Sequence, residues 1–371
     1  MTNRIQNEYF PDVVSAPGET LEEILGSRGM SQAELADRTG RPKKTINEII
    51  KGKAAITAET AIQFERALGI PASFWLAREQ NYREAIARSD DLATLQSQVG
   101  WLENVPYRAM VKLGWVPDCK EKSLQLREVL RFFGVASPTS WDGIWTAAAP
   151  AFRQSLKLRS EPVALAAWLR RGEIEASQLG CDDFDAQAFR VTLSRIRALT
   201  RDLPLDFASK VQSICSTSGV AVVFVPEISG TRVWGATRWL SPTRALIQLS
   251  LRYKTDDHLW FTFYHEAGHI LLHGKREVFV EDDEEQEAAK EAEANSFARD
   301  WLVPPSQYRA FYRKGSFSCA AVSRFAYEIG IAPGIVVGRL QHDGYLNRAH
   351  CNDLKKKLDW LESQGEEGPR V

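Results

Sequence analysis

Residues 256–274, DDHLWFTFYHEAGHILLHG, constrain this chain most, because they place His265, Glu266 and His269 in the pattern H-E-x-x-H. Residues four apart on an α-helix lie one turn apart on the same face. Both imidazoles can therefore reach one metal ion, and the spacing is typical of zinc. The pattern predicts a helix that supplies two ligands of a zinc site.

The predicted helix has clear ends and an apolar surface. Asp256 or Asp257 can cap its start, and Gly274 suits the first position after its end. Its apolar side chains are those of Leu259, Trp260, Phe261, Phe263, Ile270, Leu271 and Leu272. A helix that is apolar on nearly all sides is a core helix. An accidental H-E-x-x-H occurs in about one such sequence per hundred. An accidental motif would more often fall on an exposed helix, because burying an unpaired carboxylate such as that of Glu266 costs free energy.

A catalytic zinc ion usually takes three protein ligands and leaves one position for water. Ten residues after the first histidine, where one zinc-peptidase pattern has its third histidine, this chain has Lys275. The acidic segment 277–293 leads into a predicted helix with Ala294, Phe297, Ala298, Trp301 and Leu302 on its inward face. Glu291 and Glu293 both border that face, and spacing alone does not choose between them. Glu266, next to a ligand, is the expected general base.

Three apolar runs precede the metal helix, at 220–225, 233–240 and 244–251. Their composition predicts strands, and the short turn-rich links between them favour an antiparallel sheet. In zinc peptidases, an edge strand beside the metal helix can pair with an extended substrate. We assign that role to residues 245–251.

Residues 19–83 predict a series of short helices. Ser31 and Glu34 form a capping box that opens one helix, Gly40 makes a turn, and a further helix covers 43–50. Two short helices joined by a tight glycine-containing turn are typical of a helix-turn-helix, whose second helix enters the major groove of DNA.

The second helix of this pair lies in a cluster of positive charge. The cluster stands out because the whole chain has a formal net charge of -1. Such clustering is typical of phosphate binding, and Asn, Arg and Lys side chains can also read base edges. The expected DNA-binding residues are Arg41, Lys43, Lys44, Asn47, Lys51 and Lys53. An ordinary helical bundle with a solvated basic face is the alternative interpretation.

The run SQAELADRTGRPKKTINEIIKGK resembles the helix-turn-helix of phage-repressor-type regulators. With the following ITAETAIQFERALGIPASFWLAREQNY, it is similar to HigA-type antitoxins. That family binds operator DNA as dimers. The resemblance therefore implies double-stranded operator DNA as a partner, a homodimer, and a cognate toxin as a further partner.

HEAGH followed by EANSFARDWLVP resembles the ImmA/IrrE family of metallo-endopeptidases. The third ligand of that family lies in its E-A-N-x-F-A segment. The resemblance implies a Zn²⁺ ion held by His265, His269 and Glu293, with Glu291 as the alternative. It also implies a repressor-like protein as the substrate.

Cysteine usage and hydropathy indicate the compartment. The cysteines are Cys119, Cys181, Cys215, Cys319 and Cys351. They are scattered and form no C-x-x-C pair, so neither a disulfide framework nor a thiolate zinc site is expected. No apolar run reaches the roughly 20 residues of a membrane span, and the N-terminus lacks a signal-peptide core. We expect a soluble, cytoplasmic protein without membrane contact.

These features predict a mainly α chain with a small β-sheet, of the α+β class. The expected parts are an arm at 1–17, a helix-turn-helix domain at 18–84, a helical linker domain at 85–185 and a zincin-like metallopeptidase domain at 186–371. The predicted function is a DNA-binding transcriptional regulator, of antitoxin or repressor type, that carries a zinc-dependent endopeptidase. The alternative is a non-catalytic antitoxin or sensor whose zinc domain is structural or binds a partner.

Overall fold

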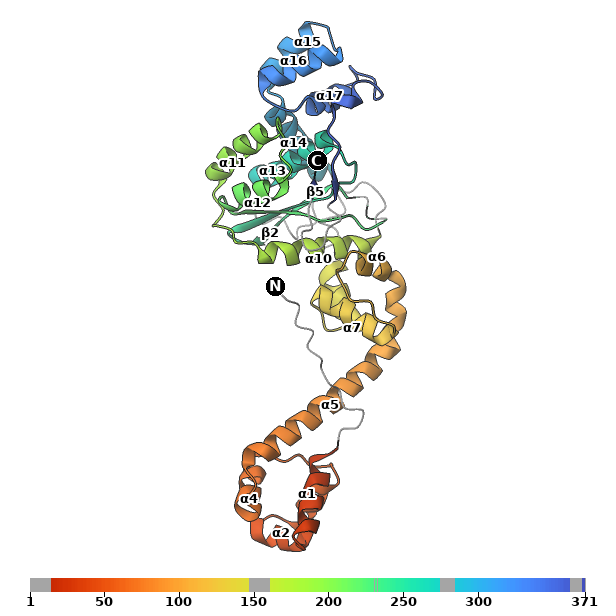
Figure 1. The fold of residues 1–371 in the computed structure, drawn as a ribbon, viewed down its shortest axis with the longest axis vertical. Helices are drawn as coiled ribbons and strands as arrows, with labels where there is room; N and C mark the ends of the chain where they lie inside the picture. The colour runs from red at the N-terminus through yellow and green to blue at the C-terminus, as the bar shows by residue number, and fades with distance from the viewer. Residues whose placement is uncertain are drawn as a thin grey trace. The chain divides into compact units, whose positions relative to one another are not determined.

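The computed structural model describes residues 15–146, 161–229, 231, 233–273, 284–360 and 369–370. The chain divides into two compact units, Met1–Val99 and Gly100–Val371. Helices dominate both units, a small sheet lies in the second, and the α+β class is confirmed (Figure 1). Most of the predicted N-terminal arm and the predicted helix stop at Gly274 lie outside the described residues.

The first unit consists of five helices: α1 (Pro17–Ser27), α2 (Gln32–Thr39), α3 (Lys43–Ile50), α4 (Ala58–Leu68) and α5 (Ala72–Gln98). The Ser31 side chain caps α2 by accepting a hydrogen bond from the Glu34 backbone N–H at 3.1 Å. Gly40 ends α2 at φ 68°, a left-handed conformation that glycine adopts at little cost. The helices α2 and α3, with the turn at Gly40 between them, form the predicted helix-turn-helix.

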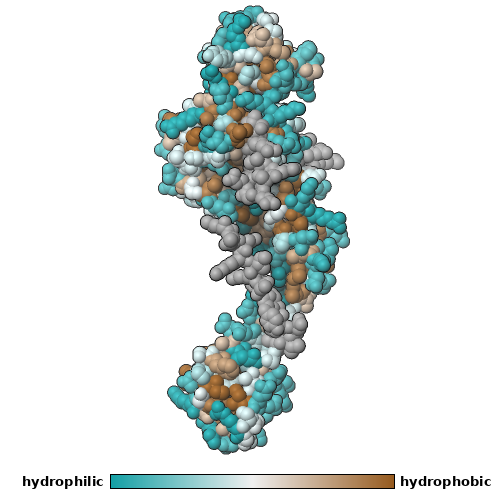
Figure 2. All heavy atoms as spheres, viewed as in Figure 1, coloured by the Kyte–Doolittle hydropathy of each residue, from teal (hydrophilic) through white to brown (hydrophobic). Residues whose placement is uncertain are grey.

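The core of the first unit is apolar, with Leu21, Leu35, Ile46, Phe64 and Trp75 fully buried. On the face shown in Figure 2, hydrophilic residues surround a smaller hydrophobic area of this unit. α5 extends well beyond residue 84, where the sequence places the end of the helix-turn-helix domain.

The next elements are η1 (Val99–Asn104), α6 (Tyr107–Lys112), α7 (Lys122–Phe133), α8 (Pro138–Trp141), η2 (Asp142–Thr146) and α10 (Pro162–Gln178). The Arg170 guanidinium on α10 donates to the Phe132 carbonyl on α7 at 2.9 Å. α10 in turn packs on the sheet of the second unit. The boundary between the two compact units falls after Val99, inside the segment 85–185 that the sequence suggests as a linker domain.

The sheet contains β1 (Val220–Phe224), β2 (Gly235–Ser241) and β3 (Arg244–Leu249) in the order β1-β3-β2. β3 runs antiparallel to β2 and parallel to β1, so the predicted all-antiparallel arrangement is wrong. The reason lies in the strand order, because β2 is placed two positions away from β1 and β3 then inserts between them. β3 is consequently the central strand, and its predicted role as the substrate-pairing edge is also wrong.

Helices cover both faces of the sheet (Figure 1). Val222 and Ile247 belong to a core shared with α11 (Ala186–Leu199), α12 (Phe207–Ser216) and α13 (Asp256–Leu272). On the opposite face, the Trp168 indole of α10 donates to the Val225 carbonyl at 3.0 Å, and the Gln248 amide donates to the Trp168 carbonyl at 2.6 Å. Coverage on both faces explains why every residue of β1, and every residue of β3 after Arg244, is buried.

The chain continues with α14 (Glu284–Leu302), α15 (Pro305–Arg313), α16 (Cys319–Ile329), α17 (Pro333–His342), η3 (Asn352–Leu354), β4 (Asp359–Trp360) and β5 (Pro369–Arg370). α17 lies against the start of α13, where a Cβ atom on Gly338 would stand 2.6 Å from Asp257 Oδ2. A disulfide joins Cys319 to Cys351, contrary to the sequence-based expectation. Spacing along the chain does not reveal such a pair, because the fold brings together residues 32 positions apart.

Among the described residues, no single helix combines the length and the apolar composition of a membrane span. In the same part of the chain, α16 and α17 reach that length and apolar composition only as a pair, and the two helices are bent by 116° relative to each other.

The first residue of α13, Asp256, is fully buried, and its Oδ1 accepts backbone N–H bonds from Asp257 and Lys356, both at 3.0 Å. Burial, and then the negative charge of Asp257, raise the pKa of Asp256 to about 7. The unfolded-state pKa is about 3.9. The folded protein therefore binds the extra proton between these two values, and its stability falls as the pH rises through that window.

We expect Asp256→Asn to stabilise the second unit more at pH 8 than at pH 5, with a difference of about 1–3 kcal/mol. The measurement is urea unfolding of parent and variant at both pH values. Asp300→Asn is the matched control, because Asp300 is exposed on α14 and its replacement should change the free energy of unfolding by a similar small amount at both pH values. A parent-to-variant difference for Asp256→Asn that is the same at pH 5 and pH 8 would contradict the prediction.

Candidate functional site

Two histidines of α13 converge at a single point. His265 and His269 lie one helical turn apart, and their Nε2 atoms are 3.0 Å from each other. His265 is buried and His269 is half-buried, so both are held in the packed interior rather than on a flexible surface. This arrangement is the one that the H-E-x-x-H spacing predicts.

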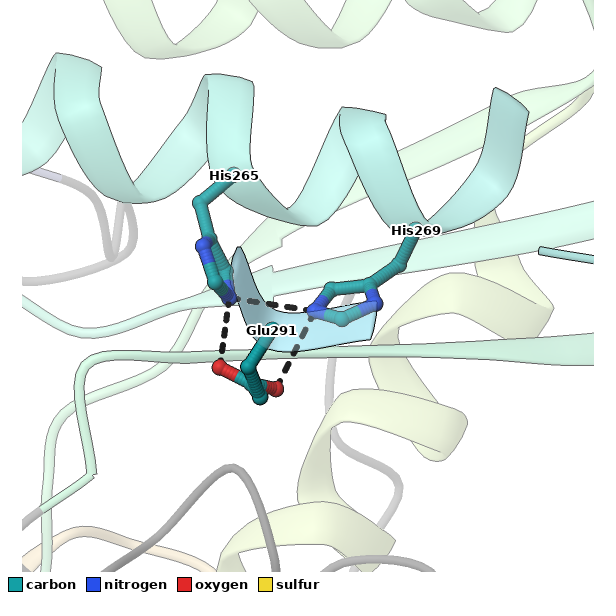
Figure 3. Close-up of side chains that lie close together, drawn as sticks. All are labelled: His265, His269 and Glu291. Carbon is teal, nitrogen blue, oxygen red and sulfur yellow. Dashed lines mark hydrogen bonds and ion pairs between the residues drawn. The ribbon is translucent and has the colours of Figure 1, made fainter. Parts of the chain in front are cut away.

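Glu291 of α14 adds a carboxylate to the two imidazoles (Figure 3). Its Oε2 lies 3.4 Å from His265 Nε2, and its Oε1 lies 3.3 Å from His269 Nε2. One donor atom from each of the three side chains falls within 4.8 Å of the other two. Two nitrogens and one carboxylate oxygen, with a further position open, are the donor set of a catalytic zinc site.

Glu293, the third ligand that the family resemblance implies, is not part of this cluster. Its Oε2 lies 3.3 Å from His273 Nε2, and 64% of its side chain is exposed. The helix explains the difference, because Glu291 shares a stripe at i, i+3 and i+7 with the fully buried Ala294 and Ala298. Glu293 is rotated by about 100° from Ala294. The structure therefore brings Glu291, the alternative candidate, to the two histidines and leaves Glu293 outside the cluster.

Two further side chains orient the imidazoles. Asn295 Oδ1 lies 3.1 Å from His265 Nδ1, and His273 Nδ1 lies 2.9 Å from His269 Nδ1. An Nδ1–H donated to Asn295 leaves the Nε2 lone pair of His265 pointing at the cluster, as metal-ligating histidines require. The sequence analysis missed Asn295, although its position four residues after Glu291 on the same helical stripe is a usable signal.

The electrostatics of the cluster suit a cation. Burial opposes protonation of His265, but the hydrogen bond to Glu291 and the charge of Glu266 outweigh it and raise the pKa of His265. For Glu291, burial is opposed by hydrogen bonds to both histidines, which lower its pKa to about 2. Glu291 is therefore ionised at neutral pH and available as a carboxylate ligand.

Glu266 is buried beside the cluster, with 5% of its surface exposed. A Cβ atom on Gly235 of β2 would lie 2.6 Å from Thr262 Cγ2 and 2.8 Å from Glu266 Oε1, so β2 passes close to the carboxylate at this glycine. The Thr237 hydroxyl, also on β2, donates to the Glu266 backbone carbonyl at 3.2 Å. The edge strand thus lies directly against the predicted general base.

The predicted DNA-binding residues occupy α3 and its flanks. Lys43, Lys44, Lys51 and Lys53 are exposed and Asn47 is half-buried, as contact with DNA requires. Arg41 differs, because its guanidinium lies 3.3 Å from a Glu59 carboxylate oxygen and also contacts Gln63 of α4. The side chain of Arg41 therefore braces α4 in this structure.

Comparison with known proteins places both units in families. A helix-turn-helix family model matches residues 21–75. The model of the IrrE N-terminal-like domain, a peptidase family, matches residues 223–320. These matches confirm the two resemblances, and they define the class as a DNA-binding helix-turn-helix regulator fused to a metallopeptidase-family domain.

Among individual proteins, Virulence-associated protein I of Dichelobacter nodosus is 37% identical over 75 residues, which are 20% of this chain and 69% of that protein. Through these residues the chain belongs to the same helix-turn-helix family. An addiction module antidote protein of the HigA family from Coxiella burnetii is 28% identical. That comparison covers 23% of this chain and 92% of the solved one, with a TM-score of 0.21.

We expect Glu291→Gln to weaken zinc binding by at least about 100-fold, because an ionised oxygen donor is lost, whereas Glu293→Gln should change it less than about 3-fold. Asn295→Ala should fall between them, at about 10- to 100-fold. Competition with a chromogenic chelator measures the affinities. Equal losses in the two glutamate variants would contradict the assignment of Glu291.

Proposed function

We propose that this DNA-binding regulator is also a zinc-dependent endopeptidase whose substrate is a repressor-like protein. The observation that carries the proposal is the convergence of His265, His269 and Glu291 beside the buried carboxylate of Glu266. A structural zinc site needs no general base. A buried glutamate next to a ligand therefore supports catalysis over a purely structural role.

Each residue of the site has a separate proposed role. His265, His269 and Glu291 would hold the ion, and Asn295 would keep the first imidazole oriented. When bound, zinc supplies Lewis-acid polarisation of a peptide carbonyl and acidifies water. Glu266 takes the proton from the attacking water and passes it to the amine that leaves as the peptide bond breaks.

We propose that β2 is the strand with which an extended substrate pairs. In the described part of the chain, β2 has a strand partner on one side only, β3, and we propose that an extended peptide pairs with its other edge. Backbone pairing along an exposed strand is a common way to hold a peptide. Because Gly235 and Thr237 of β2 both approach Glu266, a peptide paired there passes close to the general base.

We expect Glu266→Gln to reduce cleavage by about 10²- to 10⁴-fold, because amide replaces the proton acceptor. Zinc content should not change. The assay incubates zinc-loaded protein with purified helix-turn-helix repressors, and with a second copy of this chain, and detects fragments by mass spectrometry. Glu293→Gln is the matched control and should cleave like the parent. A parent that binds no zinc, or a Glu266→Gln form as active as the parent, counts against the proposal.

For the DNA-binding unit, we propose contact with operator phosphates through Lys43 and Lys44, by a dimer of the chain that places two recognition helices about one DNA turn apart. Lys43→Ala/Lys44→Ala should weaken binding to the promoter of its own operon. It should also reduce the slope of log affinity against log salt by about 1 for each lost phosphate contact. Electrophoretic retention over a salt series measures both, and Arg66→Ala on α4 is the control. Unchanged retention and slope in the lysine variant would refute the contact.

A non-catalytic antitoxin or sensor is the competing function, in which the metal only stabilises a surface for a toxin or signal. This alternative predicts that zinc binds tightly and stabilises the fold, and that no tested repressor is cut into fragments.

A further inference from the structure

A cavity of about 610 Å³ opens on the second unit beside the metal cluster. Its walls are partly apolar, with Trp234, Phe261, Leu302, Val303 and Ile335 among the lining residues. The volume lies in the range of pockets that bind ligands and exceeds the size of one amino-acid side chain. The metal-binding residues themselves are not part of its described lining.

Both helices of the metal centre continue into this cavity. On α13, Phe261 and Thr262 line the cavity and precede His265 and Glu266 by four residues, which places them on the same helical stripe. On α14, Arg299 lines the cavity four residues after Asn295 and eight after Glu291. The cavity therefore begins one to two turns, about 6–12 Å along the helices, from the cluster. An extended peptide crosses that distance in two to four residues.

The cavity is positively charged. Among the described residues, its lining includes Arg299, Arg339, Arg348 and Lys355, and Asp257 as the one carboxylate. Lys355 is neutralised by Asp257 at 2.7 Å, and Arg339 is neutralised by Asp343 at 2.6 Å. Within the described ranges, Arg299 and Arg348 have no carboxylate partner.

Arg299 is the guanidinium that is best placed to receive a ligand. Its Nη2 donates to the Ser296 hydroxyl at 2.7 Å, while its Nε is buried without an acceptor among the described residues. Buried charged donors are normally satisfied, and a carboxylate is the acceptor that matches the guanidinium fork. An incoming acidic side chain would pair with the Arg299 guanidinium, which lines the cavity and has no carboxylate partner among the described residues, and the apolar wall beside it would bury a neighbouring apolar or aromatic side chain.

We propose that this cavity is the specificity subsite of the peptidase, and that it selects an acidic residue together with an apolar or aromatic neighbour within four residues of the cleaved bond. Arg299 binds the acidic carboxylate. The inference rests on the proposed function, because it assigns the cavity to the same substrate that Glu266 acts on.

The test measures binding separately from turnover, with full-length zinc-loaded Glu266→Gln protein. The probes are fluorescein-labelled nonapeptides in which each position in turn is Glu, Gln or Lys and a second position is Phe or Ala. Anisotropy should show one position where Glu binds about 10-fold tighter than Gln, with Lys weaker still. Arg299→Gln should abolish that preference, and Arg299→Glu should shift it towards Lys, which a purely structural role for Arg299 would not do.

Arg309→Gln on α15 is the control, because Arg309 is exposed and does not line the cavity in the described structure; it should keep the preference. Thermal midpoint and zinc content of each variant report on folding. Equal binding of the Glu, Gln and Lys peptides, absence of any binding, or an unchanged preference in Arg299→Gln overturns the subsite. The preferred peptide is then given to the parent enzyme. A preference that persists without cleavage supports the subsite and counts against the peptidase, whereas cleavage without an acidic preference does the reverse.

Discussion

The close packing of α13 against α14 is the contact on which the cluster of His265, His269 and Glu291 depends. Gly268, between the two histidines, allows this approach, since a Cβ atom there would lie 3.2 Å from the Ala294 Cα. Ala294 and Ala298 are small and fully buried on the facing helix. Because small residues meet at the crossing, the Glu291 carboxylate reaches both imidazoles. The site is therefore a product of helix packing, and neither helix holds it alone.

The rest of the second unit keeps α13 in place. The apolar sheet supports one side of the helix, and α10 covers the far face of that sheet. At the start of α13, Gly334 and Gly338 of α17 make room for two buried aspartates. Burying polar groups in this way is costly unless they are paired. The two buried aspartates lie on the same helix as the cluster. Ionisable groups with shifted pKa values are often found near functional sites.

The helix-turn-helix unit has a different physical basis. In the described residues, its apolar core lies among α1 to α5, and the lysines of its basic cluster remain on the surface. Two units with separate cores can combine DNA binding and metal chemistry in one polypeptide without either site constraining the packing of the other. One residue of the basic cluster, Arg41, also stabilises the packing of the unit, because its guanidinium contacts Glu59 and Gln63 of α4.

The sequence by itself determined the helix that carries His265, Glu266 and His269, the helix-turn-helix with its Ser31 cap and Gly40 turn, and the positions of three strands. Each of these follows from local periodicity, capping and turn chemistry, which act over a few residues. Only the tertiary structure decided that β3 is central, that α10 packs on the sheet, that Cys319 meets Cys351, and that Glu291 rather than Glu293 lies beside the two histidines. Strand order, disulfide pairing and ligand choice depend on which distant faces meet, and helix packing at Gly268 selects one face of α14 where the sequence left two glutamates equivalent.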